Sequence, residues 1–120
     1  MNFREIKTSS GKRVLAGKNA KNNEELVSQI KPQEYVFHTE KPGSPFVVIQ
    51  GKVNAKDRKE AAIFCAKHSQ DWRDNKSDVI VHRFKGKDIY KSKSMKLGTF
   101  GIRKRKKIKV KKKWIESNSK

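Results

Sequence analysis

The end of the chain carries a run of positive charge that is also patterned like a β-strand. From Arg103 to Lys113, nine of the eleven residues are lysine or arginine. Apolar residues recur at alternate positions before and within this run, at Phe100, Ile102, Ile108 and Val110. A period of two places successive side chains on opposite faces of a strand. We therefore expect residues 98–113 to form a basic β-hairpin that completes a sheet and displays its charge to solvent.

The whole chain is strongly basic, and its charge rises towards the C-terminus. The 120 residues include 31 lysine and arginine residues and 12 acidic residues, for a formal net charge of +19. Residues 1–50 carry +3, residues 51–100 carry +7 and residues 101–120 carry +9. A domain with this excess has the electrostatic footprint of a nucleic-acid-binding protein. A membrane surface is a weaker candidate, because the sequence shows neither a long amphipathic basic helix nor a lipidation signal.

Length and cysteine content narrow the class of protein further. A chain of 120 residues fits one domain with its own hydrophobic core. Cys65 is the only cysteine, which excludes an intrachain disulfide and a cysteine-rich metal site. No apolar run approaches the roughly 20 residues of a membrane span, and the first residues lack the apolar core of a signal peptide. We expect a cytoplasmic protein in a reducing compartment.

Hydrophobic periodicity predicts an α+β fold. We expect strands before the basic hairpin over residues 3–7, 13–16, 34–38, 45–50 and 78–84. The strand over residues 45–50 is apolar enough to be buried on both faces. Together with two helices, these strands predict a mixed, mainly antiparallel sheet in a single domain. We expect that domain to span residues 1–113 and to be followed by a short C-terminal tail over residues 114–120.

Two helices are expected between the strands. The first covers residues 22–30, with Asn19 or Asn22 as its N-cap. The second is the longest element, over residues 55–73 after Asn54. Its apolar stripe recurs at helical spacing and consists of Ala61, Phe64, Cys65, His68 and Trp72. This stripe predicts a helix packed along one face of the sheet.

The residue types that usually carry catalysis or bind metals are scattered. His38, His68 and His82 show no ligand spacing, so we expect no metal. Residues 98–101, Gly-Thr-Phe-Gly, lack the spacing and the lysine of a phosphate-binding P-loop. Nothing in the sequence forms a recognisable set of nucleophile and base. We therefore expect a protein that is not an enzyme and needs no cofactor.

Two polar loops are candidates for contacts with a nucleic acid. Residues 17–23 contain a glycine, two lysines and three asparagines at the start of a helix. Backbone amides and lysine at such a position make a phosphate site, and simple helix capping is an equally good explanation. Residues 38–44 offer a histidine, a lysine and a serine hydroxyl to phosphate or sugar. The alternative for this loop is an ordinary turn set by Pro42 and Gly43.

The basic hairpin is the third candidate. Like charges side by side on a strand are destabilising, and one or two lysines are enough to guard a sheet edge. Nine basic residues exceed that structural need and favour a function. The candidate nucleic-acid-binding residues from the three regions are Lys18, Asn19, Lys21, Asn22, His38, Lys41, Ser44, Arg103, Lys104, Arg105, Lys106, Lys107, Lys109 and Lys111.

The order of these segments resembles the NFACT-R domain, the RNA-binding module of the RqcH/NEMF family of ribosome quality control proteins. The resemblance rests on residues 17–27, on Val36-Phe37-His38, on Pro42-Gly43-Ser44 before Pro45-Phe46-Val47-Val48-Ile49, on residues 60–72, and on Gly98-Thr99-Phe100-Gly101-Ile102-Arg103. It covers roughly residues 11–112, and the Pro-Phe-Val-Val-Ile form is closer to archaeal and eukaryotic members. The turn after Ile102 departs from the family, because it has Lys104-Arg105-Lys106 in place of a glycine.

The resemblance implies RNA binding, with ribosomal RNA or tRNA as the RNA and the ribosome as a further partner. It does not carry over tRNA recruitment or C-terminal tailing, because the N-terminal domain and coiled coil of the full-length proteins are absent from this sequence. Two alternatives stay open. The chain could bind double-stranded DNA, or it could be a subunit of an RNA-modifying enzyme with His38, Glu40 and Ser44 at its centre.

Overall fold

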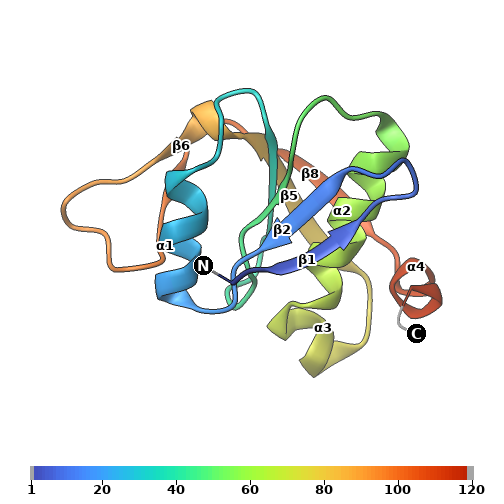
Figure 1. Ribbon diagram of the computed structural model, residues 1–120. Helices are drawn as coiled ribbons and strands as arrows, with labels where there is room; N and C mark the ends of the chain where they lie inside the picture. Colours follow the sequence, from blue (N-terminus) through green and yellow to red (C-terminus); the bar gives the residue numbers. More distant parts are fainter. Residues whose placement is uncertain (1, 119–120) are drawn as a thin grey trace.

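The fold is built on one antiparallel sheet of six strands (Figure 1). The computed structural model describes residues 2–118. Its strands are β1 (Arg4–Lys7), β2 (Arg13–Ala16), β3 (Tyr35–Thr39), β4 (Val47–Ile49), β5 (Val79–Lys85), β6 (Ile89–Tyr90), β7 (Gly101–Ile102) and β8 (Lys106–Val110). Its α-helices are α1 (Ala20–Ser28), α2 (Ala55–Lys67), α3 (Gln70–Asn75) and α4 (Lys112–Ser117). These elements confirm the predicted α+β class.

The large sheet has the strand order β1-β2-β4-β3-β5-β8, and β6 pairs with β7 in a second small sheet. Every strand pair is antiparallel, so the sheet is not mixed. The pairs β1–β2 and β3–β4 are hairpins with short connections, which suit antiparallel strands. None of the helices within residues 2–118 has the length and apolar character needed to cross a bilayer.

Two hydrophobic clusters cover the two faces of the sheet. One lies under α2 and includes Phe37, Val47 and Ile49. The other lies under α1 and includes Phe46 and Val48. Neighbouring residues of β4 therefore belong to opposite clusters, as the period of a strand requires. The prediction that this strand is buried on both faces is confirmed, because Val47, Val48 and Ile49 are all buried.

The predicted long helix over residues 55–73 is wrong in one respect, because it is two helices. α2 ends at Lys67, and Ser69 caps a separate α3. The Ser69 hydroxyl donates to the Ala66 carbonyl at 2.7 Å and accepts the Trp72 N–H at 3.1 Å. A serine that can bond to nearby backbone competes with continued helix, and this one turns the chain. Trp72 is nevertheless buried, as its place on the apolar stripe predicts.

The predicted hairpin over residues 98–113 is also wrong in its pairing. β7 pairs with β6, with Ile89 opposite Ile102, whereas β8 pairs with β5 at the edge of the large sheet. The alternation itself is confirmed, because Phe100 and Ile102 pack in the cluster under α1, and Ile108 and Val110 pack in the cluster under α2. A period of two identifies a paired strand but does not identify its partner. Here β7 pairs with the preceding β6 and not with the following β8.

The expected C-terminal tail is largely structured. Residues 112–117 form α4, and Ile115 is fully buried in the cluster under α2. The Lys112 N–H donates to Asp78 Oδ1 at 2.8 Å, which fixes the start of the helix beside β5. One fully buried isoleucine is enough to dock the segment. Residues 119–120 of the expected tail lie outside the described residues.

Candidate nucleic-acid interface

The two polar loops predicted from the sequence meet at one end of the sheet. Together with residues 97–99 they line a groove of about 360 Å³, which we call the loop groove. Its polar and charged lining includes Arg4, Lys18, Asn19, Ser44, Arg73 and Thr99. Among residues 2–118, no acidic side chain lines this groove. The loop groove therefore presents cations to a ligand without an opposing carboxylate.

The loop over residues 17–23 is organised by its asparagines. Asn19 caps α1, and its Oδ1 accepts the Asn22 N–H at 2.8 Å. Asn22 is only 8% exposed, and its Oδ1 accepts the Lys18 N–H at 2.9 Å. Capping, one of the two explanations offered for this loop, is therefore present. It leaves Lys18 and Lys21 as the exposed cations at the start of α1.

A glycine and an asparagine join the two loops. Asn23 Oδ1 accepts the Phe46 N–H at 3.2 Å, and the Gly17 N–H donates to the Phe46 carbonyl at 3.1 Å. A Cβ at Gly17 would lie 1.9 Å from Asn23 Oδ1, which is impossible without moving the side chain. Gly17 is thus needed for a close approach between the loops rather than for an unusual backbone angle.

The loop over residues 38–44 is held by internal hydrogen bonds. Ser44 Oγ accepts the Thr39 N–H at 3.0 Å and donates to the Pro45 carbonyl at 2.9 Å. His38 Nδ1 lies 2.8 Å from the Thr39 carbonyl, and its ring centroid is 4.7 Å from that of Phe46. Burial lowers the pKa of His38, so the ring is neutral at physiological pH. His38 and Ser44 shape the loop. Exposed Lys41 is its cation, with Nζ 3.6 Å from Asp71 Oδ1.

The glycine-containing segment after residue 97 closes the groove against α1. Gly98 has a φ of +80°, and a Cβ there would lie 2.8 Å from the Ala20 Cα. Its N–H donates to Glu24 Oε2 at 2.7 Å. Lys91 Nζ binds the same carboxylate and the carbonyls of Lys96 and Thr99. Lys91 is thus a structural lysine, and it holds Thr99 in the lining of the groove.

The second basic surface is the edge strand β8 with the residues around it. We call it the β8 edge; its predicted members are Arg103, Lys104, Arg105, Lys106, Lys107, Lys109 and Lys111. All seven are exposed. Because Ile108 and Val110 face α2, Lys107 and Lys109 point to the opposite face of the sheet. The apolar side of β8 anchors the strand while its other side faces solvent.

One row of residues across neighbouring strands connects the β8 edge with the loop over residues 38–44. His38 pairs in register with His82, and His82 with Lys107. Lys107 Nζ lies 2.8 Å from Glu40 Oε1, and His82 Nε2 lies 3.2 Å from the same oxygen. Their hydrogen bonds lower the pKa of Glu40. Lys107 keeps 66% of its side chain exposed, so it remains available to a second anion.

The predicted site residues thus separate into two groups. The exposed cations lie in or beside the loop groove and along the β8 edge, whereas Asn19, Asn22, His38 and Ser44 position the backbone. Sequence reasoning missed Arg4 on β1 and Arg73 on α3, which line the groove. Each is an isolated arginine in the sequence, so only the tertiary fold reveals its place.

The chemistry of the remaining groups offers no metal site. Within residues 2–118, no cluster of three histidine, cysteine, aspartate or glutamate residues could hold a metal ion. Cys65 is buried, and burial raises the pKa of its thiol to about 12. A thiol with that pKa is protonated at neutral pH and unreactive.

Comparison with known families decides what kind of domain this is. The family description "NFACT protein RNA binding domain" matches residues 2–104. The chain belongs to this family. It is therefore an RNA-binding domain, and the predicted resemblance is confirmed. The match ends before β8, so the most basic strand of the sheet lies outside the matched residues.

One solved structure shares the fold over nearly the whole chain. It is the C-terminal part of the fibronectin/fibrinogen-binding protein from Streptococcus suis, with a TM-score of 0.84 over 98% of this chain. The two sequences are 24% identical, and this chain spans 49% of that one. At this identity the likeness shows the shared fold alone. No curated protein matches the sequence.

Proposed function

We propose that this domain binds structured RNA, either ribosomal RNA or tRNA, without catalysing a reaction. It would act in the cytoplasm, in translation or ribosome quality control, with the ribosome as a further partner. The observation that supports this most is the convergence of two predicted loops into a cationic groove with no acidic lining, next to an exposed basic strand. A-form RNA is read mainly through phosphates and 2′-hydroxyls, which need fixed cations and hydrogen-bond donors.

The arrangement of charges supports a backbone contact over a base-specific one. The strand β8 rises about 3.3 Å per residue, so Lys107 and Lys109 on one face are about 7 Å apart. That spacing is close to the distance between successive phosphates of an RNA strand. Short lysine contacts to phosphate fix the position of a protein on RNA but carry no sequence information.

The catalytic alternative gains no support from the geometry. His38, Glu40 and Ser44 each bind a different partner, namely the Thr39 carbonyl, the side chains of His82 and Lys107, and the Pro45 carbonyl. They do not form the chain of nucleophile, base and orienting group that nucleophilic catalysis needs. We therefore keep the proposal of a binding module.

Competition binding tests this proposal. The full chain is mixed with a fluorescent RNA hairpin, and the anisotropy is followed as unlabelled competitors are added. We expect an RNA hairpin, a tRNA transcript and a ribosomal RNA fragment to compete well, and a DNA hairpin of the same sequence to compete at least several-fold less well. Equal competition by the DNA would contradict the RNA preference and favour the double-stranded DNA alternative.

Charge-removing substitutions test whether RNA binds at the loop groove. Lys18→Gln with Lys41→Gln removes two exposed cations from the two loops. Lys93→Gln with Lys113→Gln removes two exposed cations that belong to neither loop and serves as a matched control. We expect the first pair to weaken binding of the hairpin clearly more than the control pair. Equal losses would mean that net charge alone, not this surface, determines the affinity.

A further inference from the structure

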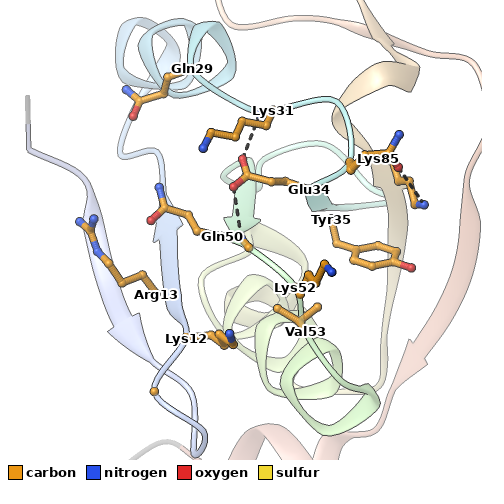
Figure 2. A pocket seen from close by; sticks show the side chains of 13 residues that line it. Lys12, Arg13, Gln29, Lys31, Glu34, Tyr35, Gln50, Lys52, Val53 and Lys85 are labelled. Atoms are coloured by element: carbon orange, nitrogen blue, oxygen red, sulfur yellow. Dashed lines mark hydrogen bonds between the residues drawn. The ribbon is translucent and has the colours of Figure 1, made fainter.

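A large recess lies at the other end of the sheet from the loop groove. It has a volume of about 900 Å³ and opens between the β1–β2 hairpin, the end of α1 and the loop that follows β4 (Figure 2). Five cationic side chains line it: Lys12, Arg13, Lys31, Lys52 and Lys85. We call this recess the Tyr35 basin, after the aromatic residue in its wall. Neither the family match nor the solved structure assigns it a role.

Most of the positive charge of the basin is left without a counter-charge, although Arg13 pairs with Glu5 of β1 at 2.9 Å. The one acidic residue in its lining, Glu34, is 8% exposed. Its two carboxylate oxygens accept the backbone N–H groups of Lys31 at 2.9 Å and of Gly51 at 3.3 Å (Figure 2). Glu34 therefore ties two loops together. Lys31 and Lys52 are exposed, and their ammonium groups form no ion pair with any of residues 2–118.

Tyr35 sits among cations. The Cζ atoms of Arg58 and Arg83 each lie 5.3 Å from its ring centroid, and Lys85 Nζ lies 5.5 Å from it. The ring is half-buried at the start of β3. An aromatic ring flanked by arginine and lysine is the arrangement on which unpaired bases stack while cations hold the adjoining phosphates.

A second recess continues the basin past Tyr35. It has a volume of about 340 Å³ and shares Tyr35 and Lys85 with the basin. Its other cationic lining residues are Arg83, Lys87, Lys104, Arg105 and Lys106. A cationic path therefore runs from the β1–β2 hairpin to the start of the β8 edge, with Tyr35 between its two halves.

We propose that the Tyr35 basin binds a single-stranded segment of RNA, with one base stacked on Tyr35 and the neighbouring phosphates on the lysines on either side. This inference rests on the proposed function, because it assigns the basin to a second part of the RNA that the domain is proposed to bind. In a duplex both faces of each base are covered by its neighbours. A ring set into a recess can reach only a base that has left the stack. Structured RNA with a single-stranded end or loop would then span the β8 edge and the basin.

Two RNAs that differ only in a single-stranded extension test the inference. One is a blunt hairpin, and the other is the same hairpin with six added uridines. We expect the wild-type chain to bind the extended RNA more tightly. Tyr35→Leu should reduce that advantage by at least about five-fold, while Tyr35→Phe should keep it. Binding of the blunt hairpin should be the same for all three proteins.

A charge pair provides a second readout if Tyr35→Leu unfolds the domain, which its melting curve would show. Lys31→Gln with Lys52→Gln removes two exposed cations of the basin, with Lys93→Gln and Lys113→Gln as the matched control. We expect the basin pair to reduce the advantage of the extension and to leave the blunt hairpin unaffected. Equal weakening of both RNAs would overturn the inference, because the basin would then contact duplex backbone.

The outcomes separate the two proposals. If the wild-type chain binds neither RNA, the proposed function fails. If it binds the blunt hairpin but gains nothing from the extension, only the basin is assigned wrongly. The same conclusion follows if a folded Tyr35→Leu variant keeps the full gain.

Discussion

Gly17 and Asn23 show how single residues build the loop groove. The absence of a side chain at Gly17 lets Asn23 reach the Phe46 N–H at 3.2 Å and connect the two polar loops. The sequence alone could mark both residues as polar-loop candidates for binding phosphate. It could not show that Asn23 serves the other loop, because that contact joins residues more than twenty positions apart.

Gly17→Ala tests this contact between the two loops. The new methyl group would lie 1.9 Å from Asn23 Oδ1 and displace it, leaving the Phe46 N–H without its partner. We expect the free energy of unfolding, measured with urea, to fall by about 1–3 kcal/mol. RNA affinity should fall too, since the groove depends on both loops. Stability equal to that of the wild type would show that the contact between the two loops can rearrange without cost.

His38 makes the stability of the domain depend on pH. Its pKa is lowered by burial, and so is that of His68. The unfolded chain, with histidine pKa values near 6.5, then binds more protons than the folded chain in mildly acidic solution. The contribution to stability is complete above about pH 6.5 and is lost as the pH falls below it.

Urea unfolding at pH 7.5 and at pH 5.5 measures this loss. We expect the wild-type domain to lose stability over that interval, because the unfolded chain takes up more protons there than the folded chain does. His38→Phe should show a smaller loss, whatever its absolute stability. The carboxylates with lowered pKa values, such as Glu40 and Asp57, titrate below this interval, so they do not contribute to the change in stability measured across it. Equal losses in both proteins would contradict the assignment to His38.

At the scale of elements, the sequence predicts which segments are strands and helices better than how they pair. Strand β2 lies where predicted, and β3, β4 and β5 lie within two residues of their expected limits. The partners of β7 and β8 could not be predicted, because alternation of apolar residues is the same for any paired strand. The break between α2 and α3 depends on Ser69, whose hydroxyl bonds to the backbone only in the folded chain.

The short helix α4 was the element hardest to predict. A six-residue helix in a lysine-rich segment has little intrinsic stability, so its order comes from packing beside α2. Ile115 is fully buried there, and Lys59 Nζ lies 4.1 Å from the ring centroid of Trp114. The docking could not be predicted from the sequence, because no local pattern in this segment indicates its packing partner.

Ile115→Ala tests whether α4 belongs to the core. Removing a fully buried isoleucine side chain should lower the free energy of unfolding by about 2–5 kcal/mol and reduce the melting temperature. Ser117→Ala, two residues away and exposed, serves as the control and should have little effect. A melting temperature unchanged by Ile115→Ala would mean that the segment is a disposable tail after all.

At the scale of the whole molecule, the basic residues are divided between the two ends of one sheet. The loop groove lies where β3 ends and β4 begins, and the Tyr35 basin lies where β3 begins and β4 ends. The edge strand β8 runs along the side of the sheet between these ends (Figure 1). The excess charge was evident from the sequence, but its division between two recesses follows only from the antiparallel pairing.

The salt dependence of RNA binding measures how many of these cations contact phosphate. If about five phosphates are neutralised, the logarithm of the affinity for a duplex RNA should fall with the logarithm of salt concentration with a slope of about −4. Lys107→Gln with Lys109→Gln should make the slope shallower by about 2. The control pair Lys93→Gln with Lys113→Gln should leave it unchanged. An affinity that does not change with salt, or a slope unaffected by the β8 substitutions, would contradict RNA binding through this surface.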